Sequence, residues 1–548
     1  MKKNLFKKNL LVLVLALSVV FPSFSAAQTA TKAKSPAMRA AENITAAQLR
    51  DYLYFVASDE MEGRDTPSRG LDATAKFIGT MLSRWGFKPA GDNGTFFQKI
   101  ALTRDLIDVD NNKLEVGDQK FMFGEDFFRL GGNATAPNAP LVFAKDGWFV
   151  KSKGIDALNG VDAKGKVLVI YSTGFSRNTL TPFPKGITPA DIAGAKGVDW
   201  ADPMTYAKQK GAVGIILVSS PELQQNWEQV KRFLSRGGLY PEKLRDAGAN
   251  QSLPTLLVSN KVGEAIFASE SGNTTSTTAF DTKKTANLSA MSKTETVMTQ
   301  NVVALWEGSD AQLKSEMVAI GAHYDHVGIN PNAKSEDKIW NGADDDGSGT
   351  VAVLSMAEAL AKSPKRPKRS ILLVWHAGEE KGLWGSEYFN KFPTVDIKKV
   401  ITQLNIDMIG RSRKTDDANP KNKELTGESE VYVIGSEMMS SKLGEITKSV
   451  NNSFLKLNYD YRYDDPKDTN RFFFRSDHFN YAVNGIPVVF WFDGVHEDYH
   501  QPGDEPQKID YDKMQKVSRT IFLTMWELAD LKERPKVDKQ LPPELTQR

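Results

Sequence analysis

The stretch NGADDDGSG, residues 341–349, sets three consecutive aspartates between glycines and runs directly into the helix-like segment TVAVLSMAEALA. Carboxylates packed this closely repel one another, so we expect the loop to face a positive charge. A cation held at the N-terminal end of a helix meets this requirement. For the stretch taken alone, an acidic surface turn that caps the helix is the alternative.

The composition is that of an ordinary globular protein, and it restricts the metal chemistry. The 548 residues are 40% hydrophobic and 25% charged, with a mean hydropathy of −0.39. This length is sufficient for more than one domain. The chain has no cysteine, so any metal ion must be held by histidine, aspartate and glutamate.

The first residues have the pattern of an export signal. A basic segment, MKKNLFKKN, precedes the apolar run LLVLVLALSVVF and the small-residue stretch SFSAA, which predicts a signal peptide over residues 1–27 and a periplasmic or secreted protein. No other apolar run approaches the length of a membrane span. Removal of the four lysines of this segment leaves 66 basic and 68 acidic side chains. This balance argues against nucleic acid or an anionic membrane as the main partner.

The periodicity predicts an α/β domain interrupted by a smaller β-rich insertion. Strand and helix patterns alternate after Val302, which indicates a mostly parallel sheet covered by helices on both faces. Many short strands and few helices set apart the insertion at residues 112–297. The other predicted limits are a mobile leader at 28–43, the α/β domain at 44–111 and 298–533, and a disordered tail at 534–548.

Histidines and acidic residues follow the predicted strands of the α/β region. All six histidines lie after residue 320, and four of them fall just beyond strand ends. In open α/β sheets the ligand crevice lies outside the carboxyl ends of the strands, so five loops should bring these side chains to one edge. The sequence therefore predicts a metal site among His323, Asp325, His326, Asp344, Asp345, Asp346, Glu379, Glu380, Asp407, His496 and His500.

The same residues lie in motifs that resemble a known family. HYDH, NGADDDGSG, HAGEEKGLWGS, NIDMIG, RSDH and DYHQPGD occur in this order between Ala322 and Asp504, and EMEGR near Glu60 resembles the opening segment of that family. Together they are similar to the zinc-dependent exopeptidases of the bacterial leucyl-aminopeptidase type, whose fold glutamate carboxypeptidase and the glutaminyl cyclases share. The insertion, with GKVLVIYS and YAKQKGAVGIILVSS, is similar to a protease-associated domain.

The resemblance implies a site with two Zn²⁺ ions per chain. Asp345 would bridge the ions, with His323 and Asp407 on one ion and Glu380 and His500 on the other. The peptide bond between Asp345 and Asp346 should be cis. Two-metal hydrolytic sites commonly hold their ions in this way.

Neighbours of these ligands take the remaining roles. Glu379 and Glu380 are adjacent, and in an extended segment their side chains point in opposite directions, so Glu380 can bind metal while Glu379 acts as the general base. Asp325, two residues after His323, suits the carboxylate that orients that imidazole.

Two further residues are assigned to the substrate by the resemblance alone. Tyr499 matches the position that hydrogen-bonds the substrate carbonyl as negative charge develops, and Arg475 matches a substrate-binding arginine. We expect structural or supporting roles for the remaining histidines, His326, His376, His478 and His496. Asp344 and Asp346 are expected to cap the helix or to accept hydrogen bonds from loop amides.

The predicted function is an exported dinuclear zinc metallo-aminopeptidase that hydrolyses N-terminal residues from peptides. A dipeptidase or carboxypeptidase on the same fold is the first alternative and would need a basic pocket for the substrate carboxylate. A glutaminyl cyclase would have a single zinc, and a non-catalytic binding ectodomain would have lost ligands, so the complete set argues against both. The sequence contains no G-x-S-x-G motif, which argues against a serine hydrolase. The insertion is predicted to be a substrate-restricting lid, with a partner-binding module as the alternative.

Overall fold

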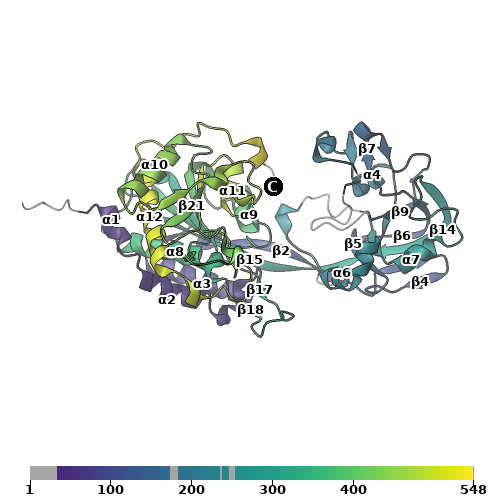
Figure 1. The fold of residues 1–548 in the computed structure, drawn as a ribbon, viewed down its shortest axis with the longest axis horizontal. Coiled ribbons are helices and arrows are strands. Elements are labelled where there is room, and N and C mark those ends of the chain that lie inside the picture. The colour runs from purple at the N-terminus through teal and green to yellow at the C-terminus, as the bar shows by residue number, and fades with distance from the viewer. Residues whose placement is uncertain (1–33, 173–182, 185, 235–236, 246–252, 547–548) are drawn as a thin grey trace, which may run out of the picture.

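Two bodies make up the part of the chain described by the computed structural model, which comprises residues 34–172, 183–184, 186–234, 237–245 and 253–546. One body carries most of the helices, and the other is rich in strands (Figure 1). The long strands β2 (Phe97–Ile107) and β15 (Ser292–Trp306) run from the first body toward the second. None of the described helices is long and apolar enough to cross a membrane.

A ten-stranded sheet forms the centre of the helix-rich body. Besides β2 and β15 it contains β1 (Lys88–Pro89), β12 (Leu239–Pro241), β16 (Met317–His323), β19 (Ser370–His376), β20 (Val400–Ile406), β21 (Glu430–Ile434), β22 (Asn458–Asp460) and β23 (Val488–Phe492). The strand order is β12-β2-β15-β19-β16-β20-β23-β21-β22, with β1 beside β15.

This sheet is mixed, which corrects the expectation of a mostly parallel sheet. The strands β19, β16, β20 and β23 pair in parallel, as do β21 and β22 at one edge. Most of the other pairings involve β2 or β15 and are antiparallel: β15 returns alongside β2, with Ser292 opposite Ile107 and Val302 opposite Phe97, before it pairs with β19. The strand β21 also pairs antiparallel with β23. The entry and exit of the insertion therefore add antiparallel strands to a parallel centre.

Helices cover both faces of the sheet, as alternation along a strand requires. Val318 and Ile320 of β16 pack into the hydrophobic core on one face, and Met317 and Ala319 into the core on the other. The first face carries α1 (Pro36–Ala41), α2 (Ala46–Val56), α3 (Arg69–Arg84), α8 (Gly349–Lys362), α10 (Ser441–Ser453) and α12 (Tyr511–Asp530). The second face carries α9 (Trp384–Lys391) and α11 (His478–Val483).

The strand-rich body is built on an eight-stranded sheet. Its strands are, in order, β4 (Gln119–Phe121), β3 (Lys113–Val116), β14 (Phe280–Ala290), β6 (Ala134–Phe143), β9 (Val167–Tyr171), β11 (Gly214–Val218), β13 (Thr255–Val258) and β5 (Phe127–Gly131). The helices α4 (Pro203–Gln209), α5 (Pro221–Gln225), α6 (Trp227–Leu234) and α7 (Asn260–Phe267) accompany it, with a small sheet of β7 (Phe149–Val150), β8 (Ile155–Asp156) and β10 (Trp200–Ala201). Separate hydrophobic cores lie on its two faces.

The described parts of both terminal segments pack against the helix-rich body. Residues 1–33, which include the predicted signal peptide, lie outside the described residues. The rest of the predicted mobile leader forms helix α1, whose Ala40 and Ala41 are buried in the core with α8 and α12. In the predicted disordered tail, Leu545 is buried and Arg534 pairs with Glu316. Small and apolar side chains in these polar segments supply packing that composition does not reveal.

Candidate metal centre

Four parallel strands deliver histidine and carboxylate to one edge of the sheet. The strand β16 ends at His323, and Asp407 follows β20 directly. Glu379 and Glu380 come shortly after β19, and His500 lies in the loop after β23. The aspartates of residues 344–346 lie in the turn Ala343–Ser348 that leads into α8. This is the arrangement expected when ligand-binding loops follow parallel strands.

The turn before α8 depends on two glycines. Gly342 has a left-handed φ of 54°, and a Cβ atom there would lie 2.5 Å from Cγ of His326. A Cβ atom on Gly349 would lie 2.4 Å from Oδ1 of Asp346, which accepts a hydrogen bond from the Gly349 amide. The peptide bond between Asp345 and Asp346 is cis, as the resemblance implied.

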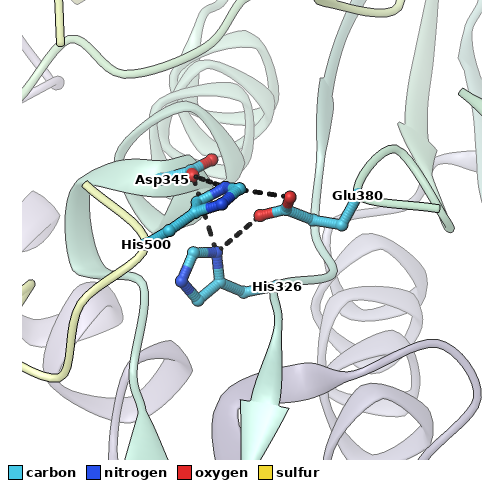
Figure 2. A group of neighbouring side chains, drawn as sticks. All are labelled: His326, Asp345, Glu380 and His500. Atoms are coloured by element: carbon cyan, nitrogen blue, oxygen red, sulfur yellow. Dashed lines mark ion pairs between the residues drawn. The ribbon is translucent and has the colours of Figure 1, made fainter. Parts of the chain in front are cut away.

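His326, Asp345, Glu380 and His500 form one group of neighbouring side chains, as Figure 2 shows. Nε2 of His500 lies 3.1 Å from Oδ2 of Asp345 and 3.0 Å from Oε2 of Glu380. Nδ1 of His326 lies 2.8 Å from Oε1 of Glu380 and 3.7 Å from the same Asp345 oxygen. Two imidazoles and two carboxylates therefore converge on one point.

A second group faces the other oxygen of Asp345. Nε2 of His323 lies 3.3 Å from Oδ1 of Asp345 and 3.7 Å from Oδ2 of Asp407. His323, Asp346 and Asp407 offer ligand atoms that all lie within 4.8 Å of one another. Asp345 therefore separates two clusters and presents one carboxylate oxygen to each.

The donors of both clusters are suited to zinc. Among the described residues, His323 Nε2, His326 Nδ1, Asp345 Oδ2, Glu380 Oε1 and His500 Nε2 are buried atoms without a hydrogen-bond partner. Buried polar atoms rarely remain without a hydrogen-bond partner, so a bound cation fits this set of atoms. Imidazole and carboxylate are zinc ligands, and this site has no thiolate that would favour a softer ion.

Burial and neighbouring charges both shift pKa values in the site. Burial alone would lower the pKa of His500, but Asp345 and Glu380 raise it to about 10. Burial raises the pKa of Glu379 well above its ordinary range, with further contributions from Glu380 and Asp407. The carboxylates of the site are thus crowded, and a bound cation would relieve their mutual repulsion.

The sequence that forms this site also resembles known proteins. Residues 301–525 match the family model described as Peptidase family M28. We call this matching stretch the M28 segment. A probable leucine aminopeptidase of Arthroderma benhamiae is 28% identical over 226 residues, which cover 39% of this chain and 55% of the relative. Aminopeptidase YwaD of Bacillus subtilis is 24% identical over 326 residues, covering 56% of this chain and 64% of the relative. The chain thus spans just over half the length of these relatives.

Solved structures of aminopeptidases also match the chain. The aminopeptidase from Aneurinibacillus sp. strain AM-1 superimposes with a TM-score of 0.48 and 16% identity, covering 93% of this chain and 98% of that one. The zinc aminopeptidase BSAP from Bacillus subtilis gives a TM-score of 0.45 and 16% identity, covering 92% and 99% of the two chains.

The M28 segment contains every residue that the sequence assigned to the metal site. The structure brings together the five predicted ligands, His323, Asp345, Glu380, Asp407 and His500. It also places two residues among the ligand atoms that were expected only to support the site, since His326 belongs to the first cluster and Asp346 to the second. Asp346 additionally has its expected capping contact with the amide of Gly349. The only sequence signal for His326 was its position three residues after His323.

Supporting residues fix the ligand loops of the M28 segment. Nδ1 of His323 lies 3.1 Å from the main-chain oxygen of Asp325 and 3.6 Å from its carboxylate. That carboxylate also accepts a hydrogen bond from the Glu379 amide. Asp504 accepts hydrogen bonds from the amides of Asp344 and Asp345. The loops that carry the ligands are therefore tied to one another through carboxylates.

The other histidines of the M28 segment lie outside both clusters. Nε2 of His496 lies 3.2 Å from Asp344, and the buried His478 stacks on Phe490. Nε2 of His376 is 3.2 Å from the hydroxyl of Tyr481 in the core. These placements match the structural or supporting roles expected of all three.

A cleft opens beside the clusters. The hydroxyl of Tyr499 accepts a hydrogen bond from Nη2 of Arg475 at 3.1 Å, and the Tyr499 ring stacks on His500. The cleft is lined by Asp345, Glu379, Asp407, Met408, Phe472, Arg475, Phe490, Phe492, Val495 and Tyr499. Both residues assigned to the substrate thus lie in this cleft.

Proposed function

We propose that the chain is an exported zinc aminopeptidase with two metal ions. The observation that carries this proposal is the carboxylate of Asp345, which presents Oδ1 to His323 and Oδ2 to His500. The match of residues 301–525 to the model of peptidase family M28 and the names of the similar aminopeptidases support a metallo-aminopeptidase. The signal-like residues 1–27 support export.

The five predicted ligands would hold the ions. Asp345 would contribute to both positions, His323 and Asp407 would complete one, and Glu380 and His500 would complete the other. His326 is an additional donor at the second position, because its Nδ1 lies in the same cluster. When bound, two zinc ions polarise a scissile carbonyl and lower the pKa of a water molecule.

Glu379 is proposed as the general base. Its carboxylate lines the cleft, and Oε2 lies 4.0 Å from Nε2 of His323. The hydrogen bond between its amide and Asp325 holds the main chain at this point. Glu379 would take the proton of the attacking water and later donate it to the leaving amine. Burial, which raises the pKa of Glu379, makes proton uptake easier.

Tyr499 is proposed to stabilise the negative charge that develops on the carbonyl oxygen. Because Arg475 donates to the Tyr499 oxygen, the hydroxyl hydrogen of Tyr499 remains available to the substrate. A preoriented donor of this kind lowers the energy of the transition state more than that of the ground state.

The lining of the cleft favours a substrate with an apolar N-terminal side chain. Phe472, Phe490, Phe492 and Val495 present an apolar surface next to Glu379. A relative named leucine aminopeptidase agrees with this chemistry. Arg475 favours the second candidate, a dipeptidase, because its guanidinium could bind the free carboxylate of a two-residue substrate.

Metal content and turnover together test the proposal. Purified protein should contain about two zinc ions per chain, as a bridged two-metal site requires. It should release N-terminal residues from peptides, lose this activity on chelation and regain it with zinc. One zinc without such release would indicate a cyclase, and no zinc would indicate a binding protein. Faster cleavage of dipeptides than of their C-terminal amides would favour the dipeptidase.

A further inference from the structure

Arg64 is buried beneath the metal centre. Its side chain is 0% exposed, although it comes from the turn Asp59–Arg64, far upstream of the M28 segment. Among the described residues it forms no ion pair at contact distance. Instead its guanidinium donates four hydrogen bonds, all of them to main-chain carbonyl oxygens.

Three of these carbonyls belong to the loops that carry the metal ligands. Nε donates to the oxygen of Tyr324 at 2.9 Å, directly after His323. Nη1 and Nη2 donate to the oxygens of Asn341 and Gly342 at 2.7 and 2.9 Å, immediately before the aspartate turn. One rigid, planar group therefore spans both loops, which the fork of a guanidinium can do and an ammonium cannot.

The main chain of Arg64 contributes a further contact. Its carbonyl oxygen accepts a hydrogen bond from the amide of His326 at 3.1 Å. The next residue, Asp65, pairs with Lys381 at 2.7 Å, directly after Glu380. The segment from Arg64 to Asp65 thus touches all three loops that supply His323, Asp345 and Glu380.

The turn adopts an unfavourable backbone to place this arginine. Glu62, Gly63 and Arg64 have consecutive left-handed φ values of 53°, 64° and 48°. A Cβ atom on Gly63 would lie 2.4 Å from the oxygen of Trp340. Non-glycine residues adopt this conformation only where the surrounding structure enforces it, and such positions concentrate at functional sites.

The positive charge of Arg64 acts on nearby carboxylates of the site. Burial lowers the pKa of Arg64 to about 10, while Asp325, Asp504 and Asp345 act to raise it. The guanidinium therefore stays positive at neutral pH, among carboxylates that need compensation before a metal binds.

We propose that Arg64 is a positioning residue that holds the 323–326 and 341–346 loops at the spacing required to bind two metal ions. This inference rests on the proposed metal site, and it assigns a role to a residue outside the segment 301–525 that matches the family. Arg64 has no assigned contact with substrate, and it acts through His323, His326 and Asp345.

The test compares three variants of the full-length protein. Arg64→Met removes the donors, Arg64→Lys keeps the charge without the planar fork, and Arg369→Met is the control. Arg369 is 1% exposed and donates hydrogen bonds to Glu316 and to the carbonyl of Leu531. It lies directly before β19, so it is at the end of that strand away from the metal centre. Zinc affinity is measured by competition with a chelator, and amide hydrogen exchange is followed in peptides covering 323–326 and 341–349 of the metal-free proteins.

The expected result is a loss of zinc affinity of about 10- to 100-fold in Arg64→Met, the range found when partners of metal ligands are removed. A smaller loss is expected in Arg64→Lys, with faster exchange in both loops. Arg369→Met should lower the melting temperature but keep the parental zinc affinity. If Arg64→Met does not fold, the test rests on Arg64→Lys. A loss of zinc affinity in Arg64→Lys at an unchanged melting temperature supports the proposal.

Parental zinc affinity and parental loop exchange in the Arg64 variants would overturn the positioning role and leave the metal site intact. A parent protein that binds no zinc would overturn the proposed function and, with it, the role of Arg64 toward the metal.

Discussion

Glu379 and Glu380 are neighbours in the chain, yet their carboxylates approach different imidazoles. Oε2 of Glu379 lies 4.0 Å from Nε2 of His323, whereas the Glu380 oxygens lie within 3.0 Å of His326 and His500. Glu380 is thereby committed to one cluster, and Glu379 faces the cleft. This division lets two adjacent residues of one type perform different tasks.

Glu379→Gln should retain zinc and lose turnover. The amide keeps the size of the side chain but cannot accept the water proton, so we expect kcat to fall by roughly 10²- to 10⁴-fold. Steady-state kinetics and zinc analysis of the same preparation measure both effects. Glu380→Gln is the matched control and should lose zinc. A Glu379→Gln enzyme within a few-fold of the parental rate would show that the assigned base is wrong.

Tyr499→Phe should lower kcat by about 10²- to 10³-fold with little change in KM, because one donor to the developing oxyanion is lost. If Arg475 acts by holding the Tyr499 hydroxyl, Arg475→Met should add little to Tyr499→Phe in a double-mutant cycle. Additive losses would instead assign Arg475 a direct contact with substrate. Peptides with free and amidated C-termini then show whether that contact is to a carboxylate.

His326→Ser should weaken the binding of one zinc ion about tenfold or more and leave the other unchanged, because His326 belongs to only one cluster. Stepwise titration of the metal-free protein with zinc resolves the two events. His478→Gln is the control, since His478 is equally buried but packs on Phe490 outside both clusters. Two unchanged binding steps in His326→Ser would return His326 to the structural role predicted from sequence.

The insertion should restrict the length of the substrate. Ile107 pairs with Ser292 where β2 and β15 leave the helix-rich body. A two-residue Asn-Gly turn between Ile107 and Ser292 can therefore replace residues 108–291. The shortened enzyme should cleave long peptides faster relative to short ones, with turnover of a single aminoacyl substrate retained. Leu244 of the insertion packs near Tyr388, so Leu244→Ser is a milder variant for the same assay. An unchanged ratio of long to short peptide cleavage would contradict the lid.

Asp464 should make the stability depend on pH. Burial raises the pKa of Asp464 to about 7, so its contribution to stability is present below its unfolded pKa near 4 and is lost as pH rises through 7. Asn can keep the hydrogen bond from the Gly435 amide without this titration. Asp464→Asn should therefore melt at a higher temperature than the parent at about pH 8, and at a similar temperature at about pH 4. A melting-temperature difference that does not vary with pH would contradict the shifted pKa.

Sequence patterns grouped the candidate metal ligands more completely than they predicted the fold around them. Ligands such as Asp407 follow strands directly, and parallel strands must end at one edge, so local pattern was sufficient to group them. The sequence did not predict His326 as a ligand, because the loop after His323 is held by the carbonyl of Arg64, a contact between distant segments. The mixed character of the sheet was not predicted for a similar reason, since the pairing of β2 with β15 joins residues on either side of the insertion.

The placement of Arg64 and His500 sets the order in which the protein can mature. Residues from both ends of the described chain meet at one centre, with the β-rich body emerging between them. A nascent chain cannot assemble this centre until His500 and Asp504 have been synthesised, and such long-range closure makes folding slow. The β-rich body, whose sheet pairs residues from 113 to 290, can fold earlier as a unit. The proposed active centre would therefore be completed last, and the protein would have no activity until nearly the whole chain is present.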